Sequence, residues 1–132
     1  MKQEDTAPSK GFNPFADLMG LEIKDAKKGF SRCELNATPE LCNPNKVLHG
    51  GVLFSMADTG MGVALHMGLD RGQHCATIEI KIAYFRPVTD GRLVCESRVV
   101  QQGRRFAFLE SEITNGERLV AKATGTFVIN GT

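Results

Sequence analysis

The sequence lacks any marked excess of charge of one sign. Its 132 residues carry 16 lysine and arginine side chains against 15 aspartate and glutamate side chains, a formal net charge of +1. Proteins that bind nucleic acid mainly through its phosphates usually carry a basic excess. The balance therefore argues against a nucleic-acid partner, although it leaves room for a local basic patch that contacts a phosphorylated ligand.

Metal-binding, secretion and membrane-spanning patterns are also missing. No two of the four cysteines form a CxxC pair, and the three histidines show no spacing typical of zinc ligands. The polar N-terminus lacks the hydrophobic segment of a signal peptide, and no apolar run approaches the ~18 residues of a transmembrane helix. We expect reduced cysteines, no metal, no cofactor, no membrane partner and a cytoplasmic location.

The pattern along the chain predicts one domain. We expect a flexible N-terminus over residues 1–11 and a single domain over 12–130, because no repeat or long linker divides the chain. Asn13 and Pro14 are typical of a helix start, and Asn115-Gly116 is a hairpin signal. The expected elements are helices at 14–19 and about 50–68, and strands at 20–28, 30–37, 75–85, 92–101, 105–114 and 118–129.

The long helix is predicted to be central. The segment from Leu48 to Leu69 is apolar almost all round, which is typical of a buried helix. In a chain this short, only the sheet can cover it. Short turns between the strands favour antiparallel pairing. We therefore predict an α+β hot-dog fold, with a curved six-stranded antiparallel sheet wrapped around one helix. Gly60 and Gly62 weaken that helix and suggest close approach to the sheet.

Alternation with a period of two predicts which strand residues share a face. In the second strand these are Ser31, Cys33, Leu35 and Ala37. In the strand at 75–85 the apolar set is Ala76, Ile78, Ile80, Ile82 and Tyr84.

Asp58 is the first candidate catalytic residue. It is the only charged side chain between Lys46 and Asp70, taking the histidines as neutral. An aspartate in an apolar segment needs hydrogen-bonding partners or changes its protonation state. A structural carboxylate would be satisfied by backbone groups or exposed where the helix reaches the surface. A functional carboxylate would lie in a cleft and stay reactive, and we favour this second interpretation.

The start of the same helix is the second candidate element. Gly50 and Gly51 lie where backbone N–H groups have no partner within the helix, and glycine lets a ligand approach closely. A helix N-terminus also favours developing negative charge. These properties suit an oxyanion hole, although His49-Gly50-Gly51 could simply turn the chain into the helix.

The spacing of these elements predicts an oligomer. Gly50 and Asp58 are eight residues apart, which is about 12 Å along a helix axis. One carbonyl group cannot lie within hydrogen-bonding reach of both. If both act on one bond they come from different chains, so we predict a two-fold dimer with composite sites.

These residues resemble the hot-dog-fold acyl-CoA thioesterases of the phenylacetate-degradation (PaaI) type. The resemblance covers about residues 12–129. It rests on the pattern Asn43-x5-His49-Gly50-Gly51-x6-Asp58, on the strand Thr77–Pro87, on the turn Gln102-Gly103-Arg104-Arg105 and on the closing strand Ala121–Phe127.

The resemblance implies hydrolysis of an acyl-CoA thioester to a free acid and CoA. Asp58 would be the nucleophile or general base, and the Gly50 N–H would polarise the thioester carbonyl. Asn43 would orient the thioester or the water, and Asn45 is an alternative residue for this role. Asn43 could instead only form an Asn-Pro turn with Pro44. His49 would support the loop, and the Thr77 hydroxyl would hold the attacking water. The family also implies a dimer of dimers, that is, a homotetramer.

Other candidates concern substrate binding. Arg86, Gly103, Arg104 and Arg105 are candidates for contacting the CoA phosphates, unless these arginines are simply solvated. Tyr84 could stack on the pantetheine or adenine, or pack in the sheet core. Gly51, Phe54 and Met61 could line the acyl pocket, with plain core packing as the alternative for Met61.

Two other functions fit parts of the sequence. One is a non-catalytic acyl-CoA-binding or regulatory domain. The other is a hot-dog hydratase, which would pair a histidine with a carboxylate; His66 follows Asp58 without that family's spacing. No GxSxG motif is present, which disfavours a serine hydrolase. Open at this level are the acyl group, a covalent against a general-base mechanism, the tetramer packing and the pathway.

Overall fold

The computed structural model describes residues 7–131 and contains two α-helices, one short 3-10 helix and six strands. The helices are α1 (Pro14–Met19), the 3-10 helix η1 (Pro39–Leu41) and α2 (Gly50–His66). The strands are β1 (Glu22–Lys27), β2 (Phe30–Asn36), β3 (His74–Tyr84), β4 (Arg92–Gln102), β5 (Phe106–Asn115) and β6 (Arg118–Asn130). Every predicted helix and strand is present with nearly the predicted bounds.

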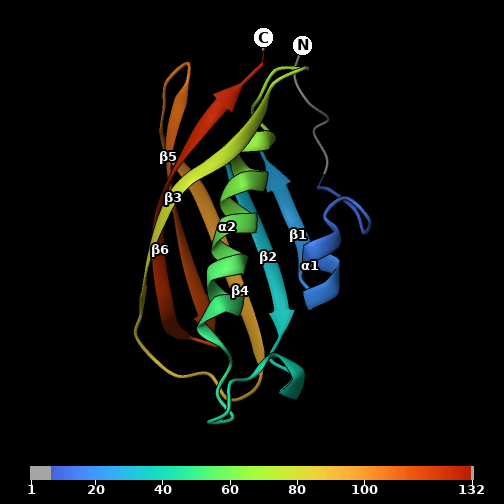
Figure 1. Ribbon diagram of the computed structural model, residues 1–132, viewed down its shortest axis with the longest axis vertical. Coiled ribbons are helices and arrows are strands. Elements are labelled where there is room, and N and C mark those ends of the chain that lie inside the picture. The colour runs from blue at the N-terminus through green and yellow to red at the C-terminus, as the bar shows by residue number, and fades with distance from the viewer. Residues whose placement is uncertain (1–6, 132) are drawn as a thin grey trace.

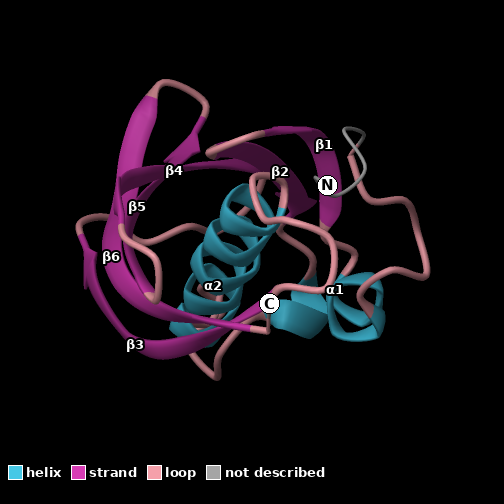
Figure 2. Cartoon of the chain, turned by 90° about the horizontal axis from the view of Figure 1, so that it is seen from above, coloured by secondary structure: helices cyan, strands magenta, loops and turns pink. Residues whose placement is uncertain are grey.

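The strands form one antiparallel sheet in the order β1-β2-β4-β5-β6-β3. The sheet curls around α2, as Figure 2 shows from above. Figure 1 shows α2 in front of the sheet, with β3 on one side and β1 and α1 on the other. The predicted hot-dog architecture is therefore confirmed. β3 is an edge strand, because its second edge pairs with no strand of the described chain.

The helix α2 is not buried on every side, which corrects the sequence-based expectation. Its buried residues, such as Met56, Met61 and Leu65, pack on the concave face of the sheet. The sheet does not close between β3 and β1, so part of α2 stays uncovered. Gly51 and Phe54 are exposed there, and Ser55 and Asp58 are partly buried. We call these four residues, which share one helix face, the open stripe.

The prediction that alternate residues of β3 from Ala76 to Tyr84 share one face is wrong for the first part of the strand, because a β-bulge interrupts it. Thr77 pairs with Phe127 and Glu79 with Thr126, which leaves Ile78 as an extra residue without a partner. A bulge of one residue reverses the alternation of side chains. Cys75 and Thr77 therefore approach α2 before the bulge, and Ile80 and Ile82 join the core after it. Ala76 and Ile78 are exposed.

A row of serines lies beneath α2 and explains one of its glycines. Ser31, Ser97 and Ser111 occupy paired positions on β2, β4 and β5 and are fully buried. Ser31 Oγ donates to the Gly60 carbonyl at 2.6 Å. A Cβ on Gly60 would lie 2.5 Å from Ser97 Oγ, so only glycine lets the helix approach this closely. The predicted shared face of Ser31, Cys33 and Leu35 is confirmed by their burial.

The N-terminal part of the chain lies beside the sheet. Asn13 accepts a hydrogen bond from the Ala16 N–H and caps α1, as the sequence predicts. Residues 1–6 of the predicted flexible N-terminus lie outside the described residues, and the flexibility of residues 7–11 and the domain bounds stay predictions. Within residues 7–131, no helix is long and apolar enough to cross a membrane.

Candidate active site

Asp58 and Thr77 meet on the open stripe. The Thr77 hydroxyl donates to Asp58 Oδ1 at 2.6 Å, and the two residues are 19 apart in sequence. Thr77 is exposed and Asp58 is partly buried. The carboxylate therefore has one strong partner and remains accessible, so the cleft that would keep it dry is not supplied by this chain alone. The sequence pattern placed both residues on the site, but gave no sign of a direct bond between them.

The start of α2 presents backbone N–H groups to one end of the molecule. His49 is the N-cap, and its Nδ1 accepts a hydrogen bond from the Gly51 N–H at 2.8 Å. Among the described residues, no hydrogen bond reaches the Gly50 N–H. The structure thus agrees with a supporting role for His49 and leaves the Gly50 N–H available to a ligand.

Asn43 lies in the loop that leads into this helix. Its side-chain oxygen accepts hydrogen bonds from the backbone N–H groups of Asn45 (2.9 Å) and Val47 (3.3 Å). A hydrogen bond from the His49 N–H to the carbonyl of Leu41, the last residue of η1, closes this loop. Asn43 therefore shapes the turn through its oxygen. Its amide nitrogen, which these bonds do not use, is the group that could donate to a substrate.

Tyr84 contacts the helix start from the end of β3. Its hydroxyl donates to the Gly50 carbonyl at 2.8 Å, and about half of the side chain is exposed. Packing within the sheet core, one of the two sequence-based readings, is therefore wrong. The bond itself has no signal in the sequence, because its acceptor is a backbone carbonyl 34 residues away.

The two parts of the candidate site lie at different places along one chain. Asp58 is hydrogen-bonded to Thr77 on β3. Thr77 pairs across the sheet with Phe127 on β6, and Phe127 pairs with Ala107 on β5, which is next to the β4–β5 turn. Gly50 is hydrogen-bonded to Tyr84 at the other end of β3. Tyr84 pairs with Ala121 near the start of β6, far from the β4–β5 turn. The structure thus does not bring Gly50 and Asp58 together within one chain.

The candidate arginines are divided in the same way. Arg86 follows β3, at the Tyr84 end, and is exposed. Gly103, Arg104 and Arg105 form the exposed β4–β5 turn, closed by a bond from the Gly103 N–H to the Phe106 carbonyl. No ion pair is found for these arginines among residues 7–131, so their guanidinium groups are available to phosphates.

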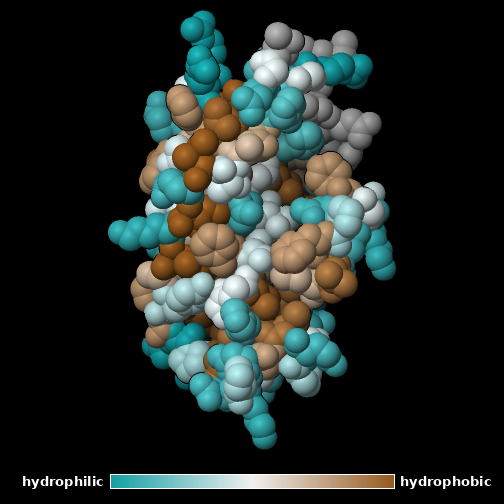
Figure 3. Space-filling model, in the orientation of Figure 1, coloured by the Kyte–Doolittle hydropathy of each residue, from teal (hydrophilic) through white to brown (hydrophobic). Residues whose placement is uncertain are grey.

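Of the candidate acyl-pocket residues, two belong to the accessible surface. Gly51 and Phe54 lie on the open stripe. Met61 is fully buried and packs over Gly125, where a Cβ would lie 2.8 Å from its sulfur. This placement agrees with core packing for Met61. Figure 3 shows hydrophobic side chains gathered on the same face of the molecule, over β3 and toward α1.

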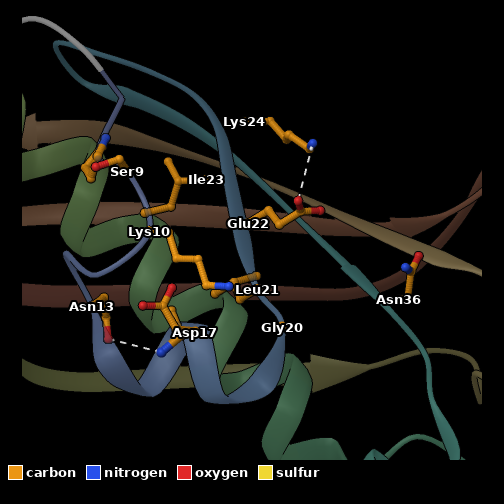
Figure 4. Close-up of a pocket in the computed structure, with 12 residues that line it drawn as sticks. Ser9, Lys10, Asn13, Asp17, Gly20, Leu21, Glu22, Ile23, Lys24 and Asn36 are labelled. Carbon is orange, nitrogen blue, oxygen red and sulfur yellow. Dashed lines mark hydrogen bonds and ion pairs between the residues drawn. The ribbon is translucent and has the colours of Figure 1, made fainter.

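Two cavities on the surface of the described chain lie away from these residues. One, of about 520 Å³, is formed by the N-terminal segment, α1 and β1, and holds the side chains of Lys10, Asp17, Glu22 and Lys24 (Figure 4). The other, of about 530 Å³, lies between residues 7–12 and the end of α2. Neither contains Asp58 or Gly50.

Cys75 and His66 are poor candidates for catalysis. Burial, and then the Asp58 carboxylate, raise the pKa of the Cys75 thiol to about 11, so it stays protonated and weakly nucleophilic. The ring of His66 packs against Phe12, with centroids 5.7 Å apart. That contact places His66 at the far end of α2, which does not favour the histidine–carboxylate pair of a hydratase.

Comparisons with known proteins agree with the fold and identify the family. The family model of the thioesterase superfamily matches residues 45–122, more than half of the chain. The medium/long-chain acyl-CoA thioesterase YigI of Salmonella typhimurium is 27% identical over 132 residues, covering 88% of this chain and 85% of its own.

Solved structures are similar over most of their length. The conserved protein PA5202 of Pseudomonas aeruginosa is 35% identical, with a TM-score of 0.89 over 93% of this chain and all of its own. The PaaI protein of the Escherichia coli phenylacetic acid degradation operon is 28% identical, with a TM-score of 0.84 over 92% of this chain and 88% of its own. The chain therefore belongs to the thioesterase superfamily, as a hot-dog-fold enzyme of the thioester hydrolase class.

Proposed function

We propose that this protein hydrolyses an acyl-CoA thioester to a carboxylic acid and CoA at a site built around Asp58. The observation that carries the proposal is the Asp58 carboxylate, held by Thr77 on the uncovered face of an otherwise apolar helix. An accessible carboxylate with one fixed hydrogen bond, in an enzyme of this superfamily, is suited to act as a base or a nucleophile.

The chemistry needs few protein groups. As a general base, Asp58 takes a proton from water while the water oxygen attacks the thioester carbonyl carbon. As a nucleophile, it attacks that carbon itself, and water then hydrolyses the anhydride. In both cases negative charge develops on the carbonyl oxygen, where the Gly50 N–H donates, with Asn43 as a second donor. The C–S bond breaks when this first tetrahedral intermediate collapses, which gives the free acid in the first route and the anhydride, before its hydrolysis, in the second. The CoA sulfur leaves as a thiolate that takes up a proton.

A second protomer is proposed to complete the site. Gly50 lies about 12 Å along α2 from Asp58 of the same chain. The open stripe and the unpaired edge of β3 lie side by side, and such an edge is a ready surface for pairing with another chain. A two-fold contact here would bring Asp58 and Thr77 of one protomer to Gly50, Tyr84 and Asn43 of the other. It would also exclude water from the carboxylate.

The substrate class is proposed from the same surfaces. Arg86, Arg104 and Arg105 are exposed at opposite ends of one chain, and a two-fold contact would gather both sets around one CoA. For the acyl group we propose an aryl, phenylacetyl or medium-chain thioester beside Phe54. The proposal also includes a role in phenylacetate degradation and a cytoplasmic location. We further propose that the protein is a dimer of dimers and uses no metal or other cofactor.

The test is thiol release from a panel of acyl-CoA thioesters. Asp58→Asn keeps the size of the side chain and removes its basicity, so kcat should fall by about 100-fold or more. Asp25→Asn, at an exposed carboxylate on β1, is the matched control and should keep full activity. Turnover at the wild-type rate in Asp58→Asn would overturn the proposal. So would tight acyl-CoA binding without thiol release by the wild type, or hydration of an enoyl-CoA.

A further inference from the structure

The peptide bond between Gly50 and Gly51 is held at both of its polar ends. Its carbonyl oxygen, on Gly50, accepts a hydrogen bond from the Tyr84 hydroxyl at 2.8 Å. Its N–H, on Gly51, donates to His49 Nδ1 at 2.8 Å. Two side chains from different parts of the chain therefore hold this peptide in its orientation, in addition to the helical geometry of α2 itself.

That orientation matters because the next peptide bond carries the proposed oxyanion donor. The Gly50 N–H belongs to the His49–Gly50 peptide, whose carbonyl oxygen, on His49, accepts a hydrogen bond from the Val52 N–H at 2.9 Å in the first turn of α2. Only the two backbone torsions of Gly50 separate the two peptides. Glycine is the residue with the most backbone freedom, so a first turn that begins with Gly50 and Gly51 holds its geometry less firmly by itself and gains from contacts outside the helix.

Tyr84 is itself rigidly placed. It is the last residue of β3 and pairs with Ala121, and the next residue, Phe85, donates its N–H to the Val120 carbonyl at 2.8 Å. A Cβ on Gly50 would lie 3.1 Å from the Tyr84 ring. The ring thus covers Gly50 closely. Partial burial raises the pKa of the Tyr84 phenol, which keeps its proton available for donation.

We propose that Tyr84 is a positioning residue for the oxyanion donor: through its hydrogen bond to the Gly50 carbonyl it holds the first turn of α2 in place, and with it the direction of the Gly50 N–H. This inference rests on the proposed thioesterase function. It assigns to Tyr84 an action through the backbone of its own chain, whereas the sequence left open stacking on the substrate or packing in the sheet core.

The test is Tyr84→Phe, which keeps the ring and removes the hydroxyl. Removal of a complete oxyanion donor costs about 100- to 1000-fold in kcat; loss of its positioning should cost about 10-fold, with KM changed less than about twofold. Thr114→Val is the matched control, because it removes a hydroxyl that donates to the Val94 carbonyl elsewhere in the sheet. It should keep the wild-type kcat.

Amide hydrogen exchange supplies a readout that does not depend on turnover. In Tyr84→Phe the Gly51 amide should exchange faster than in the wild type, while amides in the middle of α2, such as that of Leu65, should not change. A wild-type kcat, or unchanged exchange at Gly51, would overturn the positioning role. Full turnover in Asp58→Asn would instead overturn the thioesterase proposal, so the two failures can be told apart.

Discussion

At the scale of single residues, the candidate site consists of side chains that hold other groups in place. Thr77 holds the Asp58 carboxylate, His49 holds the Gly51 N–H, and Tyr84 holds the Gly50 carbonyl. Each of these bonds further restricts the motion of the group that it holds. Reduced freedom before the reaction is a general source of catalytic power.

Removal of the Thr77 hydroxyl should therefore impair catalysis without unfolding the protein. A hydrogen bond to a charged group is worth about 1.5–3 kcal/mol, so Thr77→Val should lower kcat by about 10- to 100-fold. Thr77→Ser keeps the hydroxyl and should retain most activity. Steady-state kinetics and thermal melting of both variants check this. Equal kcat values for Thr77→Val and Thr77→Ser would contradict it.

At the scale of elements, the β3 bulge decides which residues reach α2. Thr77 and Tyr84 are seven positions apart, so in a regular strand they would point to opposite faces of the sheet. The extra residue Ile78 reverses the alternation between them. Both side chains can then hydrogen-bond to the same helix. The bulge thus equips one strand to hold both parts of the proposed site.

The close contact of α2 with the serine row predicts different effects at two glycines. Gly60→Ala places a Cβ 2.5 Å from Ser97 Oγ and should destabilise the fold by about 1–3 kcal/mol, less any gain of up to about 1 kcal/mol in helix propensity. Gly62→Ala is the control, because its Cβ would lie 3.8 Å from the Phe127 ring, an ordinary contact. It should be neutral or stabilising in urea unfolding.

A double-mutant cycle identifies the cause of that difference. If the clash with Ser97 Oγ is responsible, Gly60→Ala should cost much less in a Ser97→Ala background. Additive effects of the two substitutions would show that another contact limits the approach of the helix.

Two neighbouring thiols predict a loss of stability at alkaline pH. Cys33 and Cys95 pair across β2 and β4 and are fully buried. Burial raises the pKa of Cys33 to about 12 and that of Cys95 to about 11, from the usual 9.0. Above pH 9 the unfolded chain releases protons that the folded chain keeps, so the stabilisation present below pH 9 is lost as pH rises toward 11–12.

Urea unfolding at pH 8 and pH 10.5 measures this effect. The free energy of unfolding of the wild type should fall between the two values. A Cys33→Ala/Cys95→Ala variant should show a smaller fall, although not none, because the pKa of Cys75 is also raised. The same fall in both proteins would show that other groups cause the alkaline instability.

At the scale of the whole molecule, the open stripe of α2 lies next to β3, whose outer edge is unpaired within residues 7–131, as the bond between Asp58 and Thr77 shows. Several large apolar side chains remain exposed on one chain, including Ile78 at 56% and Phe54 at 37%. A monomer would leave the Asp58 carboxylate open to solvent and its proposed oxyanion donor out of reach. These features together favour an oligomer as the active form.

Mixing two inactive variants tests the composite site directly. Asp58→Asn removes the carboxylate. Gly50→Pro removes the N–H. Proline suits the first position of a helix, and its ring would displace the Tyr84 ring of the same chain, which a Cβ at Gly50 approaches to 3.1 Å, so both changes affect the same half of the site. Each alone should be inactive. After joint refolding, half of randomly paired dimers would be mixed, and each mixed dimer would regain one of its two sites. Thiol release should return to about one quarter of the wild-type rate. No recovery in confirmed mixed dimers would place the whole site within one chain.

The sequence alone determined the secondary structure, the hot-dog architecture and the candidate site residues. These features follow from local signals: hydrophobic periodicity, turn residues and one carboxylate in an apolar helix. The bulge in β3, the open stripe and the Tyr84–Gly50 bond were decided only by the tertiary structure. They depend on how far the sheet curls and on a strand register set by distant partners, and neither is encoded in the spacing of neighbouring residues.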